Sequence, residues 1–285
     1  MIFFIKMDKK KRLIAAFLFV LTSLIFQTIG ALKVGSIAIK IDTWHTASHL
    51  MSYAIAWLAI VISTRNKDNP RYVFGTGKVE VLAGFSSAVV LGISTVQMIF
   101  HSFDRLLNPS SVQYGSAIAV ATVGLINNLV GAAILNHPDP SDHSFRAAFL
   151  HAIADILTSV LAIVGLTIQK FSGIGGVDPV IALIGCLFVV KWSVDLIANT
   201  ASILLDLRVD QQKDIIAFLE KEAGTKVTAA KIWKISPKKL AANITLRVDH
   251  PLPPNYFEYL LKLKFKQISH LLLKIKTLRP RESQR

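Results

Sequence analysis

Residues 42–62 read DTWHTASHLMSYAIAWLAIVI, which places two histidines and an aspartate at the head of an apolar run. An apolar segment of about 20 residues is long enough to cross a bilayer as a helix. Asp42, His45 and His49 are spaced i, i+3 and i+7, so they share one face of that helix. Ionisable side chains within a membrane segment are costly, and they therefore indicate a functional site.

The composition of the chain indicates a membrane protein with several spans. Of its 285 residues, 52% are hydrophobic and 18% are charged, and the mean hydropathy is +0.50. Soluble proteins of this length carry more charge. Six helices are predicted to cross the membrane, over 13–32, 37–63, 79–103, 112–135, 144–169 and 179–205.

The basic residues are unevenly distributed between the predicted loops. They are concentrated in the N-terminal segment 1–12, in the loop 65–78 and after residue 208. The positive-inside rule therefore predicts that both termini are cytoplasmic. The expected location is a bacterial inner (plasma) membrane. The net charge of +14 could suggest a nucleic-acid partner, but basic residues distributed in this way are typical of a membrane protein. No nucleic-acid-binding motif accompanies it, so lipid, and not nucleic acid, is the expected surrounding partner.

The chain changes character after residue 205, where charged residues become frequent and apolar runs shorten. The predicted elements are a helix at 211–223, strands at 230–235 and 240–248, a helix at 256–266 and a strand at 269–275. This α-β-β-α-β order predicts a small, ferredoxin-like α+β domain. The expected organisation is a basic N-terminus (1–12), a six-helix transmembrane domain (13–205), a cytoplasmic α+β domain (206–278) and a tail (279–285).

A second ionisable pair, His151 and Asp155, lies in the fifth predicted span with i, i+4 spacing. If the second and fifth spans cross at these levels, His45, His49, His151 and Asp155 can surround one ion. Three imidazole nitrogens and one carboxylate suit tetrahedral Zn²⁺ or Co²⁺ and are compatible with Ni²⁺, whereas Mg²⁺ and Ca²⁺ prefer oxygen ligands. Hydrogen bonding between helices and an axial haem site are alternatives, which the two matched pairs disfavour.

Other polar residues are weaker candidates. Asp42 lies one turn from the ligand set and is a candidate for gating or proton exchange. Asn127 and Asn128 are candidates to support the ligands, and His250 and His270 are candidates for regulatory metal binding.

The ligand type indicates an energy source. Histidine binds metal only when it is deprotonated, so metal ions and protons compete for the same nitrogens, which predicts metal/proton antiport. No nucleotide-binding loop of the Walker A type is present, so we expect neither direct use of ATP nor a resident cofactor.

These motifs resemble the cation diffusion facilitator family. Residues 42–49 (DTWHTASH) and 151–155 (HAIAD) resemble the motifs of its second and fifth membrane helices, with His49 at a position where most members carry aspartate. Residues 71–80 (RYVFGTGKVE) resemble the loop before the third helix. The Trp-His-x-x-x-His pattern at 44–49 and the segment 142–151 are most similar to the cobalt/nickel-efflux (DmeF-type) branch, although the loop 136–143 is shorter than is common there.

The resemblance implies a homodimeric secondary transporter rather than an enzyme, with six membrane helices and a cytoplasmic domain. It implies export of divalent transition-metal ions, with Co²⁺ and/or Ni²⁺ as the expected cargo. The extra histidine makes the site richer in nitrogen, which favours these ions. The alternatives are a Zn²⁺ exporter of the same family and a non-transporting membrane partner or metal sensor.

Overall fold

A computed structural model describes residues 9–34, 37–108, 114–135, 143–221, 225–248 and 253–277. The chain forms two compact units. The first consists of residues 1–68 and 79–201, and the second consists of residues 69–78 and 202–285. Within the described residues, the long helices are α2 (Lys9–Val34), α3 (Ile37–Arg65), α4 (Gly77–Leu107), α5 (Tyr114–Leu135), α6 (His143–Ser172) and α7 (Val177–Leu204).

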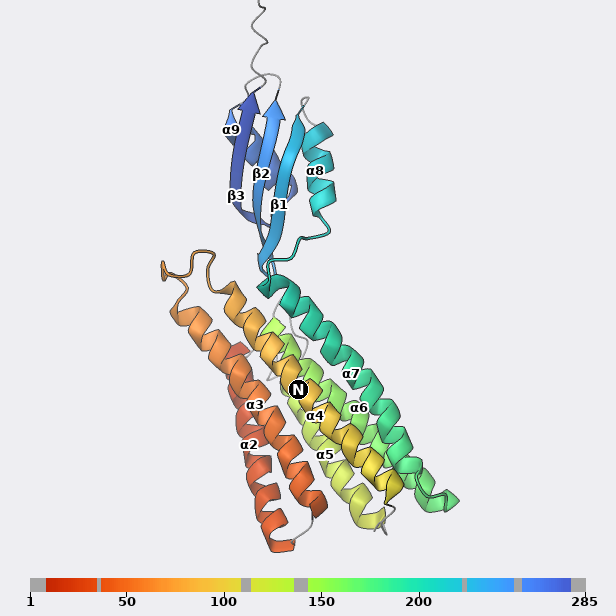
Figure 1. Ribbon diagram of the computed structural model, residues 1–285. Coiled ribbons are helices and arrows are strands. Elements are labelled where there is room, and N and C mark those ends of the chain that lie inside the picture. Colours follow the sequence, from red (N-terminus) through yellow and green to blue (C-terminus); the bar gives the residue numbers. More distant parts are fainter. Residues whose placement is uncertain are drawn as a thin grey trace, which may run out of the picture. The chain divides into compact units, whose positions relative to one another are not determined.

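The helices of the first unit run alongside one another (Figure 1). Four stretches of the described residues are long and apolar enough to cross a membrane, namely Gly77–Leu107, Ala117–Leu135, Arg146–Ser172 and Val177–Leu204. A shorter apolar helical stretch covers Leu50–Arg65. In a bilayer only structures that satisfy their own backbone hydrogen bonds can span, and these helices do so. The chain is an integral membrane protein, and the number of six spans stays a prediction.

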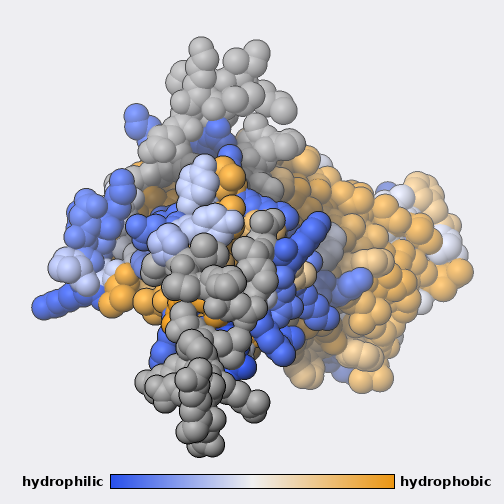
Figure 2. All heavy atoms as spheres, turned by 90° about the horizontal axis from the view of Figure 1, so that it is seen from above, coloured by the Kyte–Doolittle hydropathy of each residue, from blue (hydrophilic) through white to orange (hydrophobic). Residues whose placement is uncertain are grey.

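Large apolar side chains lie on the outside of these helices. Phe100, Phe171 and Leu187 are 69%, 81% and 68% exposed. Figure 2 shows apolar residues over much of the helical surface that is visible from above. A continuous apolar surface of this kind matches lipid, whereas in water it would promote association.

Small residues let the helices of the first unit pack closely. A Cβ atom on Gly92 of α4 would lie 2.9 Å from Ser193 Oγ of α7, and this hydroxyl donates to the Ala88 carbonyl oxygen at 2.8 Å. A Cβ atom on Gly165 of α6 would lie 2.8 Å from the Asp178 Cα of α7. Such close contacts between small residues are a common way for membrane helices to associate.

Helices α2, α3, α5 and α6 share a separate apolar core. Its buried residues are Leu13, Ala16, Val20, Tyr53, Ala56, Ile134, Leu135 and Ala148. This core brings α3 against α6, the two helices on which the sequence places the candidate ligands.

The second unit is a small α+β fold with the predicted α-β-β-α-β order. Its elements are α8 (Gln212–Lys221), β1 (Lys226–Ser236), β2 (Lys239–Val248), α9 (Pro254–Lys264) and β3 (Ile268–Thr277). The sheet order is β1-β2-β3, with β1 antiparallel and β3 parallel to β2. Alternate residues of β2 from Leu240 to Val248 are buried, and they form one core with Ile215 of α8 and Phe257 of α9. Both helices therefore cover the same face of the sheet.

Residues 69–78, which cover most of the connection from α3 to α4 and the first two residues of α4, belong to the second unit. The Phe74 ring packs edge-on against Trp233 of β1 and His270 of β3, with ring centroids 6.3 and 5.3 Å apart. Lys78 Nζ lies 2.7 Å from Asp206 Oδ1. Gly75 has a φ of 77°, a left-handed conformation that glycine adopts without strain.

Candidate metal site

Helix α6 positions His151 and Asp155 one turn apart on the same face. The His151 Nε2 atom lies 3.6 Å from Asp155 Oδ2, and the two side chains are only 2% and 4% exposed. The small residues Ala152 and Ala154 lie between the pair in sequence, and both are buried. Helical periodicity therefore delivers one imidazole nitrogen and one carboxylate oxygen to a single shielded place.

The separation of these two atoms suits a shared metal ion. Two ligands that each lie about 2.1 Å from a tetrahedral ion are about 3.4 Å apart. The observed 3.6 Å between His151 Nε2 and Asp155 Oδ2 is close to that value. The pair can therefore supply two ligands to one ion after only a small adjustment of its side chains.

Helix α3 reaches the same place through Ser52, a residue that the sequence analysis missed. The Ser52 Oγ atom lies 3.3 Å from His151 Nδ1, and Ser52 is fully buried. The neighbouring Tyr53 is also buried and lies against Gly131 of α5. The sequence holds one signal for Ser52, because it follows His45 and His49 at i+7 and i+3 and so continues their face of the helix.

The remaining predicted ligands belong to α3. The backbone of α3 includes Asp42, His45 and His49, but their side chains lie outside the described residues. Among the side chains that the structure describes, no group of three or more histidine, cysteine, aspartate or glutamate residues comes together. The four-ligand site thus stays a prediction, of which the structure describes the half on α6.

The weaker candidates are dispersed. Asn127 of α5 donates a short hydrogen bond to Ser23 Oγ of α2, and Asn128 is half-buried on the same helix. His270 is exposed on β3, with its Nδ1 3.2 Å from Ser269 Oγ. His250 lies outside the described residues. Their proposed roles stay predictions.

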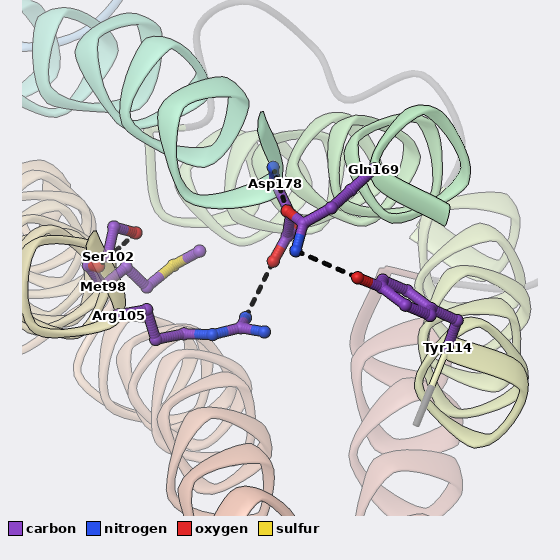
Figure 3. A network of polar contacts seen from close by, with 6 residues as sticks. All are labelled: Met98, Ser102, Arg105, Tyr114, Gln169 and Asp178. Atoms are coloured by element: carbon purple, nitrogen blue, oxygen red, sulfur yellow. Dashed lines mark hydrogen bonds and ion pairs between the residues drawn. The ribbon is translucent and has the colours of Figure 1, made fainter. Parts of the chain in front are cut away.

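A second polar cluster, also missed by the sequence analysis, joins the ends of four helices (Figure 3). Arg105 Nη1 of α4 lies 2.8 Å from Asp178 Oδ2, and the Asp178 side chain is only 5% exposed. The Asp178 backbone amide donates to Gln169 Oε1 of α6 at 3.1 Å, and Gln169 Nε2 donates to the Tyr114 hydroxyl of α5 at 3.3 Å. This cluster pairs a buried carboxylate with a cation, which is the arrangement that makes its burial tolerable.

Comparison with known proteins gives the family. The model of the cation efflux transmembrane domain matches residues 13–205, more than half of the chain. The chain is 26% identical over 278 residues to a cadmium, cobalt and zinc/H⁺-K⁺ antiporter of Bacillus subtilis, an alignment that covers 94% of this chain and 89% of that protein. It is 27% identical over 278 residues to the zinc transporter ZitB of Pectobacterium atrosepticum, with 93% and 85% covered.

A third relative is similar over a shorter stretch. The metal cation efflux system protein CzcD of Cupriavidus metallidurans is 30% identical over 185 residues, which cover 65% of this chain and 58% of that protein. None of these matches specifies the cobalt/nickel branch, which stays a prediction. The apolar helices, the appended α+β fold and the match over 13–205 agree, and the chain belongs to the cation efflux, or cation diffusion facilitator, family of bacterial membrane transporters.

Proposed function

We propose that this divalent metal efflux transporter exports Co²⁺ and/or Ni²⁺ in exchange for protons. The ion is bound by His45, His49, His151 and Asp155. The observation that carries the proposal is the buried His151–Asp155 pair, with 3.6 Å between a nitrogen and an oxygen that can share one ion. Buried ionisable groups in a membrane-spanning helix are costly and are found where ions or protons pass.

The contact between Ser52 and His151 supports a site shared by α3 and α6. His49 precedes Ser52 by three residues and His45 precedes it by seven, so a regular helix carries all three on one face. The face that meets His151 at Ser52 is therefore the face of the two α3 histidines. Asp42 continues this face one turn further and is a candidate for proton exchange.

The proposed ligands couple metal to protons. A histidine nitrogen binds either a proton or a metal ion, so protons that enter from one side displace the metal that was bound from the other. The Bacillus subtilis relative carries H⁺ antiport in its name. We further propose that both termini are cytoplasmic and that the protein is a homodimer.

Zn²⁺ is the second candidate cargo. The names of two relatives, the Bacillus subtilis antiporter and ZitB, include zinc. The proposed donor set also suits tetrahedral Zn²⁺. The nitrogen ligand at His49 favours Co²⁺ and Ni²⁺ as cargo, and an aspartate carboxylate at this position would reduce that preference.

Transport by purified protein in proteoliposomes tests the proposal. With a pH gradient imposed, a metal-sensitive dye should report uptake of Co²⁺ or Ni²⁺, and a pH dye should report proton movement in the opposite direction. His49→Ala and His151→Ala should each lower the rate at least roughly tenfold, because a ligand is lost. His101→Ala is the matched control, since His101 is an exposed histidine of α4. His49→Asp should move selectivity toward Zn²⁺.

Two results would contradict the proposal. The site assignment is wrong if His49→Ala and His151→Ala both transport like the His101→Ala control. The cargo assignment is wrong if the unmodified protein moves Zn²⁺ but neither Co²⁺ nor Ni²⁺ under the same gradient.

A further inference from the structure

A polar contact connects Ser52 of α3 with the imidazole of His151 on α6. The two residues are 99 positions apart in the sequence, and Ser52 Oγ lies 3.3 Å from His151 Nδ1. Ser52 and His151 are 0% and 1% exposed. Buried polar groups are almost always satisfied by other protein groups, and this contact is one that can hold the ring.

The described partner of Ser52 Oγ distinguishes it from other hydroxyls on these helices. Hydroxyls in helices commonly bond to the carbonyl four residues earlier. Thr64 on α3 does so with Ile60, and Thr167 on α6 does so with Ile163, each at 2.6 Å. The described contact of Ser52 Oγ crosses to His151 on another helix, where this oxygen can accept a hydrogen bond from Nδ1–H.

The two nitrogens of His151 have different surroundings. Nδ1 faces the Ser52 hydroxyl at 3.3 Å, and Nε2 faces the Asp155 carboxylate at 3.6 Å. A metal-binding imidazole coordinates through one nitrogen, while the other donates its hydrogen to a second group that fixes the tautomer and the ring orientation. With Asp155 as the adjacent ligand of the proposed site, Nε2 would face the ion and Nδ1 would carry the hydrogen.

We propose that Ser52 is a positioning residue that holds His151 as the Nδ1–H tautomer and presents Nε2 to the transported ion. The Nδ1–H donates to Ser52 Oγ, and the lone pair of Nε2 is left for metal. This inference rests on the proposed function, since it assumes that His151 is a ligand. Loss of a group that orients a metal-binding histidine typically weakens affinity by roughly 10- to 100-fold.

Calorimetric titration of the full-length protein in detergent with CoCl₂, and separately with ZnCl₂, tests the proposal. Ser52→Ala should raise Kd by roughly 10- to 100-fold, and Ser52→Thr, which keeps a hydroxyl, should restore most of the affinity. Ser87→Ala is the matched control. Ser87 is a buried serine of α4, and its hydroxyl has no hydrogen-bond partner among the described residues, so its removal should leave Kd unchanged.

A spectroscopic measurement separates positioning from general structural damage. In protein labelled with ¹⁵N-histidine, the ring signals that disappear in His151→Ala belong to His151. In the unmodified protein these signals should report the Nδ1–H tautomer, and Ser52→Ala should shift them toward a mixture of tautomers. A structural role alone would lower the melting temperature of the metal-free protein without this change.

The outcomes distinguish this inference from the proposed function. If His151→Ala abolishes binding while Ser52→Ala binds like Ser87→Ala and keeps the tautomer, the positioning role is refuted and the site stands. If His151→Ala binds metal as the unmodified protein does, the proposed site itself is refuted, and the role of Ser52 with it.

Discussion

At the scale of single residues, the Arg105–Asp178 pair decides how a carboxylate is tolerated inside the helical unit. The Asp178 side chain is 5% exposed, whereas that of Arg105 is 45% exposed. The aspartate therefore depends on its partner, while the arginine keeps access to the surroundings. Removing the partner of a buried charge is more damaging than removing both charges together.

A double-mutant cycle measures this pair. Arg105→Met alone should destabilise the protein by about 1–3 kcal/mol, because it leaves a buried carboxylate without its cation. Asp178→Asn combined with Arg105→Met should be less destabilising than the sum of the two single changes. Thermal unfolding in detergent gives the three values.

An exposed pair provides the comparison for this cycle. Lys262 Nζ and Glu258 Oε1 are 2.6 Å apart on α9, with both side chains about half exposed. Solvent-exposed i, i+4 pairs contribute only about 0.3–0.5 kcal/mol. If Arg105 and Asp178 show no larger coupling than Lys262 and Glu258, the described ion pair contributes nothing beyond a surface contact.

At the scale of elements, glycine sets how closely α6 and α7 approach. A Cβ atom at Gly165 would meet the Asp178 backbone at 2.8 Å, so a side chain there must push the two helices apart. The same contact brings Asp178 to the end of α6, where Gln169 accepts its backbone hydrogen bond. The polar cluster of Figure 3 therefore depends on a residue that has no side chain.

Substitution of Gly165 tests this close packing. Gly165→Ala should destabilise the protein by about 1–3 kcal/mol, as expected for overpacking against backbone atoms. Gly124→Ala is the matched control on α5, because a Cβ atom there meets none of the described residues within 4 Å. Alanine favours helix over glycine by up to about 1 kcal/mol, so the control should be neutral or stabilising. Equal melting temperatures for the two variants would contradict the predicted contact.

At the scale of the whole molecule, the connection between α3 and α4 belongs to the C-terminal unit. Phe74 packs against Trp233 and His270, and Lys78 pairs with Asp206. The second unit is thus assembled from two distant stretches of chain, and the paired residues Lys78 and Asp206 are 128 positions apart. A change in the C-terminal domain therefore alters the surroundings of the segment that joins two membrane helices.

Limited proteolysis tests this assembly. Phe74→Ala should increase the rate of tryptic cleavage after Arg71, because local opening becomes easier when an apolar ring contact is lost. Val73→Ala is the matched control, since Val73 is 75% exposed and its removal should leave the rate unchanged. Equal cleavage rates in the two variants would show that Phe74 does not hold the segment.

Local patterns explain what could be predicted from the sequence. The apolar runs predicted membrane helices because length and hydropathy are properties of a single segment. The α-β-β-α-β order could also be predicted, because each helix or strand follows from the pattern of its own segment, and the structure confirmed it. Strand β1 begins at Lys226, four residues before the predicted start at 230. The contribution of 69–78 to the C-terminal unit left no signal in the sequence, because it depends on contacts between distant segments.

The sequence by itself determined the family, the membrane-spanning character, the order of the C-terminal elements and the spacing that places His151 and Asp155 on one helical turn. The family follows from the resemblance of motifs such as residues 42–49 and 151–155, and the other features follow from short-range periodicity or composition. Only the tertiary structure decided that Ser52 faces His151 Nδ1, that Arg105 pairs with Asp178 and that Phe74 packs against Trp233. These pairings depend on how whole helices and strands pack, so residues far apart in the chain become neighbours only after the apolar surfaces are buried.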